Sequence, residues 1–236
     1  MKTKSPTHSF LLLSLSLALL WTGWVQPVSA STLAVDPITG TNPGFQSPFL
    51  GGDATVDPLV SFAGIERGAG VTGNIANNRY NARGWQELNV TSAISGNDYF
   101  TWQLDVAEPG LVFEFTEGSG EFLWAWQVSG EGPTNWELRT DLDGFASALA
   151  AGTMPGGGGG GGNGLASYTF GGPLFENQVS APVEFRLYAW GAASGSGTFS
   201  VNNYSIGGLV TPEPGRVLLL APAFALLVLQ RRRSGA

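Results

Sequence analysis

The sequence predicts an all-β protein whose body is an antiparallel β-sandwich of the jelly-roll kind. Short segments between residues 99 and 206 alternate apolar and polar side chains with a period of two, as do strands that pack one face on a core. Turn-forming Gly and Pro separate these segments, and no part of the body keeps a helical period for more than about two turns. Such strands require two packed sheets to bury their apolar faces.

The expected strands follow one another closely along the chain. They cover residues 99–106, 111–117, 121–128, 136–139, 183–190 and 197–206. Their apolar faces include four tryptophans that are expected in the core, namely Trp102, Trp124, Trp126 and Trp136. The best helix candidate is residues 144–151. The glycine run at 156–162 is expected to be a flexible loop, because glycine loses the most freedom on ordering.

Four parts organise the chain. We interpret residues 1–30 as a secretory signal, 31–58 as an extended lead-in with at most one edge strand, 59–209 as the sandwich domain and 210–236 as a sorting or anchor segment. In the signal, Lys2 and Lys4 precede an apolar stretch, and Val28-Ser29-Ala30 provides small residues for cleavage after Ala30. The body is thus expected between an N-terminal signal helix and a C-terminal hydrophobic helix. A membrane anchor is the alternative for the first segment.

Charge and missing residue types exclude several classes of function. Of the 11 Lys and Arg residues, six lie before residue 31 or after residue 214, whereas all 18 Asp and Glu residues lie between these points. The body therefore has a net charge of −13, which would repel the phosphates of a nucleic acid. The body also lacks Lys, Cys and His, so no His base, Cys nucleophile, Lys Schiff base or His- or Cys-ligated metal site is available. No cofactor is expected.

The C-terminal segment combines three features in a fixed order. Pro212, Glu213 and Pro214 come first, an apolar run at 217–229 interrupted by Pro222 follows, and Arg231, Arg232 and Arg233 lie close to the end. This order resembles the PEP-CTERM sorting signal of Gram-negative bacteria. The resemblance implies a transient partner, a membrane exosortase that acts near Pro212–Pro214. Arg216 and the shortness of the run, about 20 Å as a helix, depart from the usual pattern. A plain tail anchor or a frayed terminus is the alternative.

The body also resembles a domain that recurs beside this sorting tail in bacterial surface proteins. The similar stretches are Tyr80-Asn81-Ala82-Arg83-Gly84-Trp85, residues 134–145 and residues 185–192. The resemblance implies a jelly-roll sandwich without an established enzymatic activity.

Two groups of residues are candidates for ligand binding. Glu184, Arg186, Tyr188 and Trp190 alternate along one strand, and a polar and aromatic strip of this kind can stack on a sugar and hydrogen-bond to it. Cross-strand pairing on a solvated sheet face is the alternative. Asp141 and Asp143 form a weak calcium candidate, with a turn stabilised by Asp side chains as the alternative.

These observations predict a non-enzymatic protein of the cell surface or extracellular matrix, exported through the inner membrane and held there transiently or permanently by the C-terminal helix. Exopolysaccharide or biofilm is the expected surrounding, as the family resemblance implies. A lectin-like carbohydrate-binding module is the main alternative. A secreted glycoside hydrolase is a further one, because that chemistry needs only two carboxylates.

Overall fold

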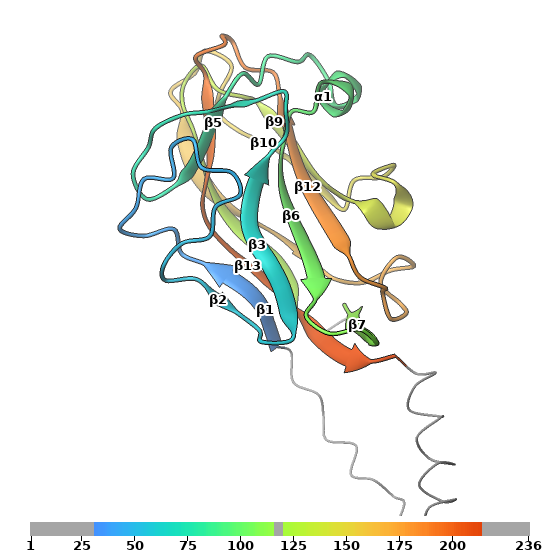
Figure 1. Ribbon diagram of the computed structural model, residues 1–236. Coiled ribbons are helices and arrows are strands. Elements are labelled where there is room, and N and C mark those ends of the chain that lie inside the picture. The colour runs from blue at the N-terminus through green and yellow to red at the C-terminus, as the bar shows by residue number, and fades with distance from the viewer. Residues whose placement is uncertain (1–30, 116–119, 214–236) are drawn as a thin grey trace, which may run out of the picture.

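The computed structural model describes residues 31–115 and 120–213, which fold into two packed antiparallel sheets (Figure 1). The five-stranded sheet has the order β10 (Ala150–Thr153), β9 (Asn135–Thr140), β12 (Val183–Trp190), β6 (Tyr99–Val106) and β3 (Val60–Arg67). The predicted all-β antiparallel sandwich is confirmed. The predicted signal at 1–30 and the hydrophobic segment beyond residue 213 lie outside the described residues.

The eight-stranded sheet is built around one long strand, β13 (Thr198–Pro212). Its main path is β11 (Gly162–Thr169), β8 (Glu121–Val128), β13, β1 (Ser31–Asp36) and β2 (Thr55–Val56). β13 also pairs with β5 (Tyr80–Arg83) and β7 (Leu111–Glu114), and β5 pairs with β4 (Thr72–Gly73). Because β1 starts opposite the end of β13, with Ser31 beside Gly208, the described chain begins and ends at the same end of the sandwich (Figure 1).

Aromatic side chains fill the space between the sheets. Trp102 packs edge-on against Phe122 at 4.9 Å between ring centroids, and Trp124 packs in the same way on Trp136 at 5.2 Å. These three tryptophans are buried as predicted, whereas Trp126 is partly buried and packs against the core from its edge. The chain has no cysteine, so the described domain depends on this packing for its stability.

The predicted lead-in, expected to hold at most one edge strand, contributes two strands to the sandwich, β1 and β2. β1 lies between β13 and β2, and Leu33 is fully buried. Asp36, also fully buried, accepts hydrogen bonds at 2.8 Å from the backbone N–H groups of Ile38 and Gly51. The Pro- and Gly-rich residues after β1 therefore form turns whose backbone is tied to the sheet, although their composition is that of a loose extension.

The helix candidate within the body was wrong. The described residues contain one α-helix, α1 (Val90–Gly96), which a capping box between Asn89 and Ser92 starts. The helix candidate at 144–151 is instead a turn followed by the start of β10, because Gly144 and Phe145 have left-handed backbone conformations, with φ of 69° and 61°. Neither α1 nor any other helix among residues 31–115 and 120–213 is long and apolar enough to cross a membrane.

The glycine run is an ordered turn rather than a flexible loop. The N–H of Gly157 donates to the carbonyl of Gly132 at 2.8 Å, and the N–H of Gly158 donates to the carbonyl of Gly130 at 2.7 Å. A Cβ at Gly156 would lie 2.2 Å from two carbonyl oxygens. The run therefore allows two backbone segments to approach so closely that side chains are excluded, and Gly162 already belongs to β11.

Candidate functional site

The predicted sorting motif begins inside the sandwich. Thr211 and Pro212 are the last residues of β13 and lie opposite Val112 and Leu111 of β7. The N–H of Glu213 donates to the carbonyl of Gly110 at 2.9 Å. The backbone up to Glu213 is thus part of the sheet. The remaining motif residues, Pro214 and Arg231 to Arg233, and the predicted cleavage residue Ala30 lie outside the described residues.

β7 holds the end of β13 because β7 is itself fixed on its other side. Phe113 and Val179 exchange two backbone hydrogen bonds of 2.9 and 2.8 Å, and the buried Phe113 ring packs on Phe115 at 5.6 Å. The side chain of Gln178 also donates to the Thr211 hydroxyl at 2.9 Å. The end of β13 is therefore anchored to the domain by both backbone and side-chain contacts.

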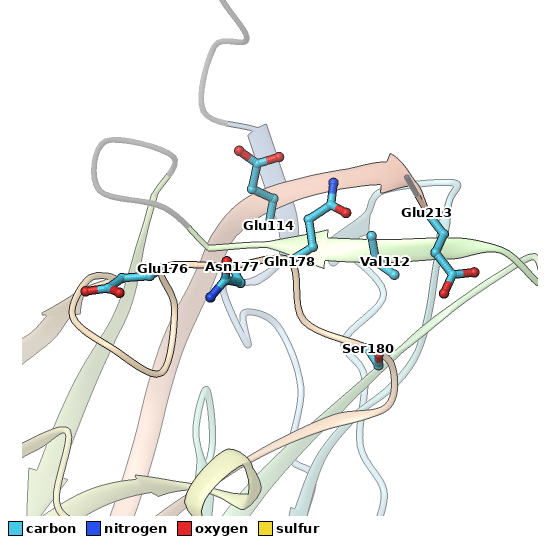
Figure 2. Close-up of a pocket in the computed structure, with 7 residues that line it drawn as sticks. All are labelled: Val112, Glu114, Glu176, Asn177, Gln178, Ser180 and Glu213. Atoms are coloured by element: carbon cyan, nitrogen blue, oxygen red, sulfur yellow. The ribbon is translucent and has the colours of Figure 1, made fainter. Parts of the chain in front are cut away.

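A hydrophilic pocket of about 580 Å³ lies at this junction (Figure 2). Its acidic side chains come from three separate segments, with Glu114 on β7, Glu176 on the segment before β12, and Glu213 after β13. Figure 2 shows these three carboxylates pointing in different directions. Within the described part of the chain no three acidic or other metal-ligating side chains come together as an ion would need. The pocket offers negative charge and hydrogen-bond acceptors, which disfavour anionic ligands.

The predicted strip on β12 is already occupied by contacts within the protein. Arg186 forms an ion pair of 2.6 Å with Glu184, and its guanidinium lies over the rings of Tyr99 and Phe145 at 4.4 and 4.0 Å. Burial lowers the pKa of Arg186, but its hydrogen bonds to Glu184 and Tyr188 outweigh this effect and hold the pKa above its ordinary value.

Tyr188 is fully buried and packs edge-on against Tyr99 at 5.3 Å. Trp190 lies at the end of β12 and is partly exposed. The structure thus brings the predicted residues together on one strand, but the polar groups and rings of Glu184, Arg186 and Tyr188 face partners from the same chain. This is the cross-strand alternative.

Asp141 and Asp143 stabilise the turn after β9 through their side chains. Asp141 accepts from the backbone N–H of Glu184 at 2.9 Å. Asp143 accepts from the N–H groups of Ala146 and Ser147 at 3.0 and 2.9 Å. These contacts correspond to the turn alternative.

A carboxyl group with a perturbed pKa lies at a position that the sequence did not single out. Asp98 follows α1 and is 3% exposed, and burial, together with the charge of Glu87, raises its pKa to about 6. Asp98 does not line the pocket of Figure 2. A glycosidase needs two carboxylates on either side of a bound sugar. Glu87 supplies a second carboxylate near Asp98, but the Asp98 side chain is buried.

Comparisons with known proteins give similarity in fold alone. No protein-family model matches the chain, and no curated protein matches it in sequence. Among solved structures, the K3 adhesin domain of Lys-gingipain from Porphyromonas gingivalis w83 is 10% identical, with a TM-score of 0.36 over 76% of this chain and 99% of that one.

Two other similar structures have different activities. CBM29_1, a family 29 carbohydrate-binding module from Piromyces equi, is 11% identical with a TM-score of 0.31, over 75% of this chain and 91% of that one. A cyclase from Fischerella sp. TAU is 14% identical with a TM-score of 0.31, over 78% of this chain and 99% of that one. Scores this low carry no argument about what the present chain binds or does.

Proposed function

We propose that this chain is an exported protein of the cell surface or extracellular matrix that an exosortase processes just beyond the end of β13. The observation that supports this proposal most is the order of features after the domain: Pro212, Glu213 and Pro214, then the apolar run, then the terminal arginines. The apolar run would stop transfer through the membrane, and the arginines would stay on the cytoplasmic side.

The fold is compatible with this arrangement. The described chain begins and ends at one end of the sandwich (Figure 1), so a body held by its C-terminal segment would project away from the membrane. The three residues Thr211 to Glu213 are engaged with β7 and Gly110. These three residues are paired within the domain, so we expect the protease to cut after Glu213.

Intact mass of the protein from its host, with and without the exosortase gene, tests the proposal. We expect a chain that begins near residue 31 and ends beyond Glu213 in the wild-type host, and a longer C-terminus without the enzyme. Combined Pro212→Ala, Glu213→Ala and Pro214→Ala changes should also leave the tail attached. Combined Pro58→Ala and Glu108→Ala changes, which alter exposed residues of the same types elsewhere, should not. An identical C-terminus in all these samples would refute the assignment.

The two alternatives receive less support from the sites that the sequence predicted. The β12 strip uses its rings and charges within the protein, so a lectin-like role would need another surface. The perturbed carboxyl of Asp98 is buried and away from the pocket of Figure 2, so a hydrolase role would need another acid. We therefore propose a non-enzymatic protein that works among exopolysaccharides.

A further inference from the structure

We propose that residues 40–46 and 75–78, here called the Phe45 surface, bind the ring face of a neutral sugar in a polysaccharide. This inference rests on the proposed function in one respect: an exported matrix protein would be surrounded by such polymers. The surface consists of the loop after β1 and the residues before β5, beside the point where β13 changes its partner from β5 to β1. Figure 1 shows the loop after β1 at the side of the sandwich, away from the end where the described chain starts and stops.

Two large apolar side chains are exposed on this surface. Phe45 is 69% exposed and Ile75 is 63% exposed, whereas Phe49, four residues after Phe45, is 5% exposed. Folding of the domain gains little from leaving an aromatic ring in water. An aromatic ring can, however, stack on the C–H face of a sugar ring, and this is the contact that an exposed phenyl group provides.

The backbone on either side of Phe45 is held in place. The guanidinium of Arg67 donates to the carbonyls of Gly44 and Gln46, both at 2.8 Å, so it fixes the residues on either side of Phe45. Arg67 is in turn held over the ring of Tyr80, at 3.8 Å from the centroid. A ligand that stacks on Phe45 would therefore not have to order this loop, which lowers the entropic cost of binding.

Two amide side chains of this surface have donors available: Asn42, which lines the same depression as Phe45, and Asn78, which lines the adjacent one. The side-chain oxygen of Asn42 accepts from the N–H of Ala76 at 3.2 Å, and that of Asn78 accepts from the N–H of Gly40 at 2.9 Å. These bonds orient each amide, and within the described residues neither amide nitrogen makes a hydrogen bond to the protein. Two N–H₂ groups are thus positioned to donate to sugar hydroxyls.

Shape and charge favour a neutral sugar. The surface is hollowed by two adjacent depressions of about 410 and 380 Å³ that share Asn42, a size typical of small-ligand sites. Their lining contains no charged side chain. Arg67 and Arg79 bond to the backbone behind the surface, but the net charge of the body, −13, would repel an anionic polymer. A stable protein partner usually covers about 800 Å² on each side, far more than the exposed faces of Phe45 and Ile75.

The other two candidate surfaces lack this combination. The pocket of Figure 2 has hydrogen-bonding groups but no aromatic side chain in its lining. On β12, the rings near Arg186 are covered by the guanidinium itself. The Phe45 surface joins an exposed ring to free amide donors, which is what recognition of an uncharged sugar requires.

Native affinity electrophoresis of the purified full chain tests the inference. The gels contain a neutral β-1,3-glucan, a xyloglucan, a galactomannan or, as an anionic comparison, alginate. We expect at least one neutral polymer to retard the wild type. Phe45→Ala should weaken that interaction by about tenfold or more, and Phe45→Trp should retain it. Leu165→Ala, which removes another exposed apolar side chain (71% exposed) on the far strand β11, is the matched control and should bind like the wild type.

Three results would overturn the inference: no retardation by any neutral polymer, equal retardation of Phe45→Ala and wild type, or stronger Phe45-dependent binding to phosphatidylcholine vesicles than to the polymers. Near-ultraviolet circular dichroism of each variant checks that the core is intact. The measurement does not depend on processing. Retardation in the gels together with an unchanged C-terminus in the intact-mass experiment on the host would refute the exosortase proposal alone, and correct processing in the host without retardation in the gels would refute this inference alone.

Discussion

Replacing the buried carboxyl of Asp98 by an amide should stabilise the domain at neutral pH and much less at acidic pH. Burial and the charge of Glu87 raise the Asp98 pKa from 3.8 to about 6. Between these values the folded chain binds a proton that the unfolded chain has released, so the free energy of unfolding falls as the pH rises through this window. Above about pH 6 the whole penalty of the buried charge is present.

The size of the effect follows from the shift in pKa. A difference of about two pKa units corresponds to roughly 3 kcal/mol. Water and nearby dipoles still stabilise the ionised group in the folded chain, which reduces the penalty. We therefore expect Asp98→Asn to increase the free energy of unfolding by about 1–3 kcal/mol at about pH 7.5. This is an increase of about 1 M in the urea midpoint for a domain of this size.

Urea unfolding followed by tryptophan fluorescence measures this change at about pH 7.5 and about pH 4. Glu108→Gln removes a charge from an exposed residue and is the matched control, with no change expected at either pH. Most of the gain from Asp98→Asn should vanish at the lower pH, because the carboxyl is then protonated in the folded chain. An equal gain at both values, or a loss at about pH 7.5, would refute the argument that a buried charge destabilises the native state.

Three further predictions concern the packing of the domain. Gly64→Ala should lower the free energy of unfolding, measured with urea, by at least about 2 kcal/mol. The reason is that φ at Gly64 is +104° and a Cβ there would lie 1.9 Å from a carbonyl oxygen. Gly52→Ala is the control, and it should have no effect because the space around Gly52 is open. Phe185→Ala should lower the free energy of unfolding by about 3–5 kcal/mol, since this fully buried ring packs on three others. Arg67→Gln should speed amide hydrogen exchange around Phe45, because the two hydrogen bonds from the guanidinium to Gly44 and Gln46 are lost. Unchanged exchange would contradict the role of Arg67 in fixing this loop.

Period-two alternation in the sequence located the strands whose own large apolar side chains fill the core. The predicted segments 99–106, 121–128 and 183–190 have the same bounds as β6, β8 and β12. In each of them large side chains such as Phe100, Phe122 and Phe185 are fully buried. The alternation in these segments therefore reports directly which face touches the core.

Of the strands that the sequence did not predict, β10 and β11 have small residues because large side chains on neighbouring strands fill the space beside them. Gly164 of β11 lies opposite Trp126, and a Cβ there would come within 2.6 Å of the indole ring. Gly152 of β10 lies opposite Trp136 with the same 2.6 Å separation. In sequence β11 follows the glycine run and β10 overlaps the helix candidate at 144–151. The reason for each glycine is a tryptophan on another strand, which the local sequence does not show.

The sequence patterns did not predict the Phe45 surface either. Phe45 and Phe49 occur in the same Pro- and Gly-rich segment, yet the first is exposed and the second is bonded through its backbone to Ile65 and lies in the core. Arg67, from a distant strand, bonds to the backbone on either side of Phe45. Only tertiary contacts distinguish an aromatic residue of the core from one presented to solvent.

The long strand β13 runs from the region of the Phe45 surface to the proposed sorting motif, so the two proposed sites lie far apart on the domain. Its Tyr204 lies opposite Asp36, the residue that precedes the Phe45 loop, and its Pro212 lies at the exit of the chain. Eight residues of strand between these points span roughly 26 Å. A C-terminal segment held at the membrane would thus leave the Phe45 surface clear of the lipid headgroups. Sorting and glycan contact could then occur at the same time, and each bound contact would raise the effective concentration of the other.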